Sequence, residues 1–259
     1  MCRSLLITLA GWLLAFSPVL ADDGEPQGRS RFRCEKDSID YLRNVGMTRE
    51  YVCRQEYKKA YQPWKDAMAS CPQAQACLYS DGVKILHVLL QAETDSAKHS
   101  MYLTELMDLY DKNIRYKKDL DRFVSKPMRR DYLLATKAYD YLHYAGSALD
   151  LHRAYTLVCD ALESVEDRPL CYLLLTWMDV NLRIYRADSS FKDTYLKDYQ
   201  NAVSLIRRSY EASGSEERRM WNETLVLVND MFRESGLAGQ LTAQTAEPLA
   251  YNKEEELLR

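Results

Sequence analysis

The chain has 259 residues, which is long enough to bury a sizeable hydrophobic core, and only 9 of them are Gly and 7 are Pro. So few turn-forming residues disfavour a turn-dense β-sandwich or barrel and favour helices. The formal net charge of −3, with 35 Lys and Arg against 38 Asp and Glu, argues against a phosphate-binding surface, so we expect no nucleic-acid partner.

Residues 1–21 predict a cleaved secretory signal peptide. The basic residue Arg3 precedes an apolar run over 5–16, and Val19 and Ala21 occupy the −3 and −1 positions of a cut between Ala21 and Asp22. We therefore expect export to the periplasm, with secretion from the cell as the alternative. No later stretch reaches the roughly 20 apolar residues of a membrane-spanning helix, so we expect no transmembrane segment in the mature chain.

The rest of the chain predicts a helical domain over 38–236 between two less regular ends. Residues 22–37 are polar and contain Gly and Pro, which predicts a flexible lead-in. From 38 onward, apolar residues recur at helical spacing. The expected helices cover 38–54, 56–70, 75–92, 97–116, 130–145, 150–165, 169–187, 193–212 and 216–235. The charged stretch 117–129 is expected to link two helix pairs, and 237–259 to form a disordered tail.

One pair of these helices carries a repeat signature. Ala60, Trp64, Ala67 and Pro72 stand at the offsets of the small, aromatic, small and proline places in the second helix of a tetratricopeptide repeat, which this segment resembles. The first helix of the pair matches less well. Met47 and Tyr51 fit the apolar and aromatic places there, whereas Asn44 and Thr48 stand where Trp and Gly are usual.

Weaker echoes follow along the chain. Leu78, Gly82 and Ile85 fall on the opening-helix places one period of about 34 residues later, and Gly82 supplies the small contact. Ala154 and Ala161 form a third echo. The resemblance implies an all-α fold, an α-solenoid of antiparallel helix hairpins built from degenerate tetratricopeptide repeats. We expect the last helix, over 216–235, to close it as a polar-backed cap.

A longer stretch is similar to a group of exported tetratricopeptide-repeat proteins of the Bacteroidota. That group has a W-x₆-C-P segment, then an L/I-Y-x-D-G-x-K helix and a Y-D-x-R-I helix. The matching residues are Trp64, Cys71, Pro72, Tyr79, Asp81, Gly82, Lys84, Tyr110, Asp111 and Ile114, while Asn113 stands where Arg is usual. The match covers about 60 residues well, and it supports the fold and the compartment.

The cysteines predict disulfides. Six remain after removal of the signal peptide, an even number in an exported chain. Cys34 and Cys53 would be about 28 Å apart on one helix, too far for a bridge. An antiparallel first pair favours Cys34–Cys71, with Cys34–Cys77 and Cys71–Cys77 as alternatives. The six-residue step from Cys71 to Cys77 does not fit a zinc site, so we expect no metal.

No nucleophile-elbow, zinc-protease, P-loop or dinucleotide motif occurs in the chain. The nearest candidates for catalysis are His143, paired with Asp140 or His152, and the carboxylates Asp119 and Asp121, all interpreted as packed or solvated residues. Asp108 and Asp111 are interpreted as surface charges that Lys112 or Arg115 screens. We therefore expect no catalytic residue and no cofactor.

The 19 tyrosines suit both helix packing and contact surfaces. Core packing explains most of them, and Tyr132 and Tyr139 are the ones we expect to line a groove that holds a peptide or partner segment. The hypothesis from sequence is a non-enzymatic scaffold or adaptor for a protein or peptide partner in the bacterial cell envelope, with a role in assembly or secretion as one form of it. A secreted factor and an enzyme with an unfamiliar site between helix pairs are the alternatives, and the oligomeric state is open.

Overall fold

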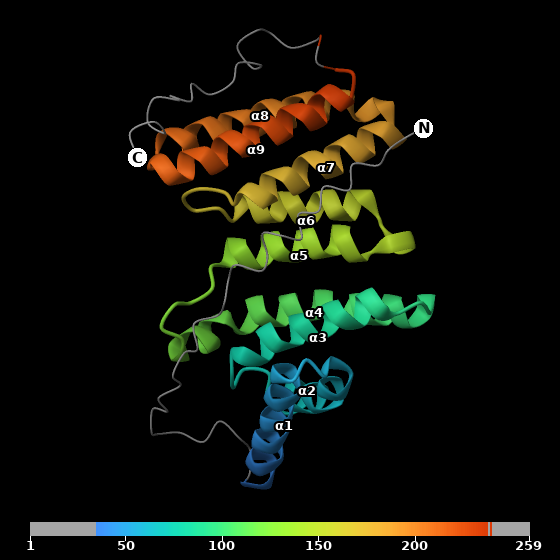
Figure 1. Ribbon diagram of the computed structural model, residues 1–259, viewed down its shortest axis with the longest axis vertical. Helices are drawn as coiled ribbons and strands as arrows, with labels where there is room; N and C mark the ends of the chain where they lie inside the picture. The colour runs from blue at the N-terminus through green and yellow to red at the C-terminus, as the bar shows by residue number, and fades with distance from the viewer. Residues whose placement is uncertain (1–34, 238, 240–259) are drawn as a thin grey trace.

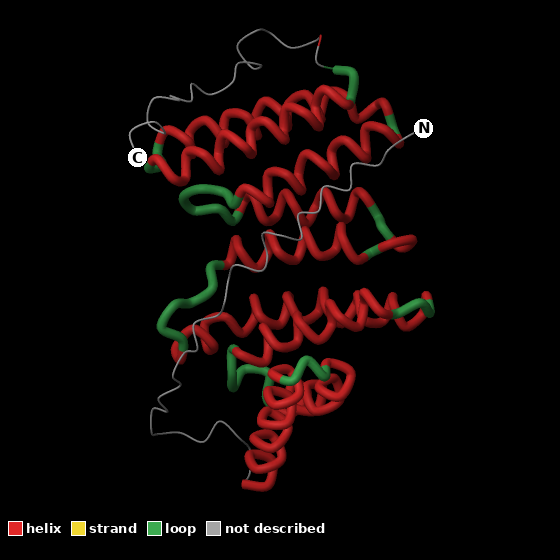
Figure 2. Tube along the Cα trace, viewed as in Figure 1, coloured by secondary structure: helices red, strands yellow, loops and turns green. Residues whose placement is uncertain are grey.

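The computed structural model describes residues 35–237 and 239, and within them it is entirely helical, as predicted (Figures 1 and 2). Nine α-helices form this part of the chain: α1 (Glu35–Cys53), α2 (Tyr57–Ser70), α3 (Cys77–Ala92), α4 (Ser96–Leu120), α5 (Arg130–Tyr144), α6 (Leu151–Glu163), α7 (Cys171–Ala187), α8 (Lys192–Glu211) and α9 (Ser215–Glu234). Three single 3-10 turns lie between them: η3 (Asp121–Phe123), η4 (Gly146–Ala148) and η5 (Ser189–Phe191).

The helices follow one another along the long axis of the molecule, from α1 and α2 at one end to α8 and α9 at the other (Figure 1). Each helix packs against its neighbour in sequence, most closely within the pairs α1/α2, α3/α4, α5/α6 and α8/α9. Helix α7 also contacts α5 and α9. It is buried nearly all round, which is why its sequence is apolar on almost every face.

The spacing of the helices differs from the expected 34-residue step. Helices α1, α3, α5, α7 and α9 begin at Glu35, Cys77, Arg130, Cys171 and Ser215, so successive starts are 42, 53, 41 and 44 residues apart. The longest step contains the stretch 117–129, which the sequence analysis assigned to a linker. In the structure α4 continues to Leu120 and η3 follows it, because Leu120 is buried and extends the apolar face of the helix.

The residues of the repeat signature lie in the core. Ala60 and Ala67 of α2 are fully buried, and so are Ala154 and Ala161 of α6. Trp64 packs against α3 of the following pair, where its Nε1 donates to the carbonyl of Leu78 at 2.9 Å. Pro72, just beyond the end of α2, accepts a hydrogen bond from the hydroxyl of Tyr79 at 2.9 Å.

Gly82 is where α3 meets this tryptophan. A Cβ at Gly82 would stand 2.6 Å from three atoms of the Trp64 indole, closer than carbon atoms approach without displacement. The absence of a side chain at Gly82 is therefore what lets α2 and α3 pack together.

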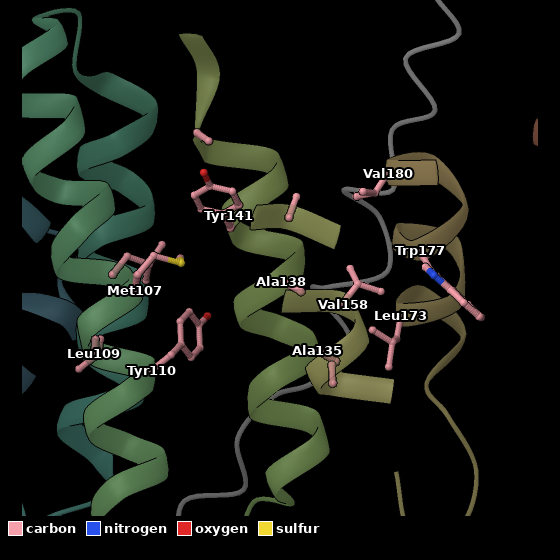
Figure 3. Close-up of a cluster of buried hydrophobic side chains, with 14 of the residues drawn as sticks. Met107, Leu109, Tyr110, Ala135, Ala138, Tyr141, Val158, Leu173, Trp177 and Val180 are labelled. Carbon is pink, nitrogen blue, oxygen red and sulfur yellow. The ribbon is translucent and has the colours of Figure 1, made fainter. Parts of the chain in front are cut away.

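The middle of the core joins four helices (Figure 3). Its labelled side chains are Met107, Leu109 and Tyr110 on α4, Ala135, Ala138 and Tyr141 on α5, Val158 on α6, and Leu173, Trp177 and Val180 on α7. Small residues on α5 face larger ones on both sides, and this allows α5 to lie between α4 and α7.

No two of the five cysteines in the described part form a disulfide, so the Cys71–Cys77 bridge is wrong; the thiol of Cys77 points to Gln75 Oε1 at 3.5 Å. The bridges that use Cys34 lie outside the described residues, as do the signal peptide with its cut at Ala21–Asp22, residues 22–34 and most of the tail. Leu237, which the sequence analysis placed in the tail, is buried.

Candidate functional site

A continuous row of aromatic rings crosses α3, α5 and α7, and we call it the aromatic ladder. In order along the row, its members are Tyr132, Tyr172, Tyr139, His143, Tyr144 and His87. The successive ring centroids are 6.5, 6.1, 5.8, 4.8 and 4.8 Å apart. Contacts at this range, stacked or edge to face, stabilise one another, so the six rings form one surface feature.

The register of α5 produces most of the ladder. Tyr132, Tyr139 and His143 are spaced by seven and four residues, which places them on one face of the helix. Tyr172, near the start of α7, meets both tyrosines edge on, with interplanar angles of 87° and 80°. At the other end of α5, Tyr144 stacks on His87 of α3.

The ladder is open to solvent on one side. Tyr132 is 36% exposed and His143 is exposed, while Tyr139, Tyr144 and His87 are half-buried. Rings in this position have one face or edge held by the protein and the other available for contact. The two tyrosines that the sequence analysis assigned to a groove, Tyr132 and Tyr139, are both members.

The buried carboxylate of Asp140 holds the His87 ring of the ladder in place. Asp140 is only 2% exposed and its Oδ2 accepts the hydroxyl of Tyr110 at 2.5 Å and lies 2.7 Å from Nε2 of His87. An ionised carboxylate only accepts hydrogen bonds, which assigns the imidazole proton to Nε2. These bonds offset the cost of burying Asp140 and hold α3, α4 and α5 in register.

The tyrosine hydroxyls of the ladder can donate as well as accept hydrogen bonds. Burial, followed by the nearby charge of Asp140, raises the pKa of Tyr144 to about 12, and the same causes in the same order raise the pKa of Tyr139. Both hydroxyls therefore keep their protons near neutral pH. Tyr144 accepts from Gln91 Nε2 at 3.2 Å, which leaves its proton available, and the hydroxyls of Tyr132 and Tyr139 make no hydrogen bond within the described part of the chain.

Tyr172 is held in a different way. Thr136 donates its hydroxyl proton to the carbonyl of Tyr132 at 2.8 Å, so in the 3.1 Å contact between Thr136 Oγ1 and the hydroxyl of Tyr172 the tyrosine is the donor. Burial raises the pKa of Tyr172 and keeps it protonated. This bond fixes the Tyr172 ring between Tyr132 and Tyr139.

An ion pair ties α5 to α4 behind the ladder. Lys137 is 8% exposed, and its Nζ lies 2.6 Å from Oδ1 of Asp111. From the sequence, Lys112 or Arg115 was expected to screen Asp111. The partner instead comes from another helix, because the long side chain of Lys137 crosses the interface and ends at its edge.

The pairing expected for His143 is also different. His143 stacks on Tyr139, with the rings within 7° of parallel. The histidine that bonds to Asp140 is His87, which precedes Asp140 by 53 residues in sequence. His152 lies at the start of α6, where its backbone N–H donates to Asp150. Asp119 and Asp121 lie near Arg122 and Lys117, at the surface beyond the ladder.

Four participants were missed from the sequence: His87, Tyr110, Tyr144 and Tyr172 were not singled out for this site. Tyr144 is the last residue of α5 and follows His143 directly, whereas His87, Tyr110 and Tyr172 come within reach of α5 only when the helices stack, and no local spacing connects those three to it. The available signal was the crowding of tyrosines in the middle of the chain.

Two open hollows lie elsewhere on the described surface. One, of about 270 Å³, is lined by residues that include Lys58, Tyr61 and Tyr102. The other, of about 350 Å³, is lined by residues that include Arg130 and Asp160. Neither of these two hollows contains a member of the ladder.

The chain was compared with protein-family models, with curated proteins and with solved structures, and no match was found. Over the described residues, no group of three or more His, Cys, Asp or Glu side chains is placed to hold a metal ion. None of the described helices combines the length and apolar character needed to cross a membrane.

Proposed function

We propose that this chain is a non-enzymatic scaffold that holds a segment of a partner protein on the aromatic ladder. The observation that carries the proposal is the continuity of six rings across three helices, with three tyrosine hydroxyls able to donate outward. Tyrosine gives a large contact area at a small cost in side-chain entropy, which suits it to protein recognition.

The proposal includes the architecture. We infer an α-solenoid of helix hairpins, α1/α2 to α7/α8, closed by α9. It is supported by the close packing of neighbours in sequence and by the polar outer face of α9, where Arg219, Glu223 and Asp230 are exposed. Stacked hairpins of this kind present extended surfaces built from several repeats, and the ladder spans three of the inferred units.

The proposed place of action is the bacterial cell envelope. It rests on residues 1–21 and on the resemblance to exported tetratricopeptide-repeat proteins, and it leaves secretion from the cell as an alternative. In the periplasm such a scaffold would act as an adaptor or as an assembly or secretion-associated factor.

An enzyme is the second candidate, because His87 and Asp140 form a close pair of the kind that orients a general base. The ring of Tyr144, however, stacks on His87, and neither of the two hollows described above includes the pair. The pair is better explained as support for the ladder.

Site-specific photo-cross-linking tests the scaffold proposal. A photoreactive phenylalanine analogue replaces Tyr132, which is 36% exposed on the ladder, and in a matched control it replaces Val226, which is 47% exposed on α9. In the native host we expect one or two envelope proteins to cross-link from position 132 and not from position 226. We also expect Tyr139→Ala to abolish this product, with unchanged helical circular dichroism.

Two results would contradict the proposal. One is the absence of any product specific to position 132. The other is a specific product whose yield is the same with and without the Tyr139 ring.

A further inference from the structure

Tyr110 lies behind the aromatic ladder and is joined to it by hydrogen bonds. It is 3% exposed, and its hydroxyl points from α4 toward α5 (Figure 3), where it donates to Oδ2 of Asp140 at 2.5 Å. The same oxygen lies 2.7 Å from Nε2 of His87, and the His87 ring stacks on Tyr144. A chain of contacts therefore runs from the exposed ring of Tyr132, through the ladder, to the buried phenol of Tyr110.

The opposite end of the ladder is also close to Tyr110. Burial, followed by the charge and the hydrogen bond of Asp140, raises the pKa of Tyr110 well above its usual value, and the neighbouring phenols of Tyr172 and Tyr132 raise it further. Aromatic side chains this close together exchange electrons readily. An electron removed from a ring of the ladder can therefore be replaced from Tyr110.

The hydrogen-bond partners decide which of these phenols is easiest to oxidise. A phenol that loses an electron becomes a strong acid, so its oxidation is favoured where a base takes the proton at the same moment. Tyr110 has an ionised carboxylate in place at 2.5 Å, a short and strong kind of hydrogen bond. The hydrogen bonds described for the ladder phenols involve neutral partners, Thr136 for Tyr172 and Gln91 for Tyr144. Tyr110 is therefore the preferred site of oxidation in this cluster.

From these contacts we propose a redox activity, in which the ladder passes one-electron oxidation from its exposed edge to Tyr110. The oxidant is a one-electron acceptor such as a peroxyl radical, and it leaves as the hydroperoxide anion. The O–H bond of Tyr110 breaks, its electron replaces the one lost from the ladder, and its proton moves to Oδ2 of Asp140. The products are a neutral tyrosyl radical and a neutral carboxylic acid, which costs less to bury than a carboxylate.

The burial of Tyr110 gives this step a consequence. The radical is shielded from solvent and from other radicals, whereas one on Tyr132 would be free to couple with a second exposed tyrosine. The activity is independent of the proposed scaffold function, because it needs no partner segment on the ladder.

Flash photolysis with electron paramagnetic resonance of the purified chain tests the proposal. Light-excited tris(bipyridine)ruthenium(II), quenched by a cobalt(III) ammine complex, supplies ruthenium(III) as the oxidant. We expect a neutral tyrosyl signal whose lifetime falls at least tenfold in Tyr110→Phe. Tyr155→Phe is the matched control, because Tyr155 also donates to a carboxylate, Asp198, at 2.7 Å, but its described ring contact is with Phe191, outside the ladder. This control should leave the lifetime unchanged. Both variants are compared at helical circular dichroism equal to that of the parent.

The parent chain supplies a second test that needs no variant. A nickel(II) chelate in the solvent speeds the relaxation of exposed radicals, and it should leave the signal unchanged because Tyr110 is 3% exposed. In Tyr110→Phe the oxidation should remain on the exposed tyrosines and at least double the yield of dityrosine. A parent signal that relaxes faster with nickel would overturn the proposal. So would an equal lifetime in folded Tyr110→Phe, or a signal lost in Tyr155→Phe instead.

Discussion

Replacing Gly82 by Ala should destabilise the protein, although alanine favours helices. The added Cβ would stand 2.6 Å from the Trp64 indole, and comfortable carbon contacts are about 3.5–4.0 Å, so the ring must withdraw by about 1 Å. That ring is 4% exposed and is held by its hydrogen bond to Leu78. Overpacking of this kind costs about 1–3 kcal/mol, and the helix gains only about 0.5–1 kcal/mol from alanine.

The expected net loss is centred on about 1 kcal/mol and reaches at most about 2.5 kcal/mol, or a fall in Tm of roughly 2–10 °C for a domain of this size. Circular dichroism during urea and thermal unfolding measures it. Gly46→Ala is the matched control, because Gly46 also lies inside a helix but no atom lies within 4 Å of its Cβ position. This control should be neutral or stabilising by up to about 1 kcal/mol.

A double-mutant cycle isolates the contact. In a Trp64→Phe background the shorter ring leaves room for the new methyl group, so the cost of Gly82→Ala should fall, with a coupling free energy of about 1 kcal/mol or more. If Gly82→Ala were as stable as Gly46→Ala, or if the cost were the same in both backgrounds, the account of how α2 packs on α3 would be refuted.

Three further changes probe the buried polar groups. Tyr110→Phe removes a donor to Asp140 and should cost about 1.5–3 kcal/mol in urea unfolding; a loss below about 0.5 kcal/mol would contradict the supporting role. Lys137→Met should be neutral within about 1 kcal/mol, because its partner Asp111 is 52% exposed and can be rehydrated. Burial raises the pKa of Asp198 above 3.8, so its contribution to stability is full below that pH and is lost as the pH rises through the folded-state pKa. The side chain of the Asp198→Asn variant cannot ionise. The urea midpoint of this variant should therefore rise relative to that of the parent between pH 4 and pH 7. A difference in midpoint that stays constant between the two pH values would contradict the raised pKa of Asp198.

The helices were predictable from the sequence because their signals are local. Apolar residues at helical spacing define the buried faces, and short polar residues mark some of the starts. Asp95 accepts from the backbone of Lys98 at the start of α4, and Asp150 caps α6 in the same way. At the other end, Gly236 follows α9 with a φ of 78°, a conformation that glycine adopts without strain.

The candidate site was predictable only in part. Tyr132 and Tyr139 lie on one helix, and their shared face could be read from the spacing. The partners of that face lie 30–53 residues away in sequence, and no periodicity links them to it. Asp140 is an example. The histidine nearest to it in sequence is His143, but in the folded chain the histidine that bonds to it is His87.

A hydrogen bond from a tyrosine hydroxyl to a carboxylate recurs along the stack of helices. Several tyrosines therefore contribute a polar contact as well as apolar packing. The hydroxyl of a tyrosine on one pair donates to a buried or half-buried carboxylate on the following pair at three successive boundaries. These bonds are Tyr61 to Glu105 at 2.6 Å, Tyr110 to Asp140 at 2.5 Å and Tyr155 to Asp198 at 2.7 Å. A comparable bond joins α8 and α9, where the hydroxyl of Tyr199 donates to Asn229 at 2.8 Å.

Apolar contacts between helices tolerate changes of register, whereas a buried carboxylate without its donor is costly. Each of these tyrosine–carboxylate hydrogen bonds therefore favours one alignment of neighbouring helices over alternatives that would bury the same apolar area. The aromatic ladder lies beside the second of these bonds, between Tyr110 and Asp140. It depends on the alignment of the helices, because its rings come from α3, α5 and α7. A partner segment that contacts the ladder would accordingly recognise the stacking of the pairs as much as the side chains themselves.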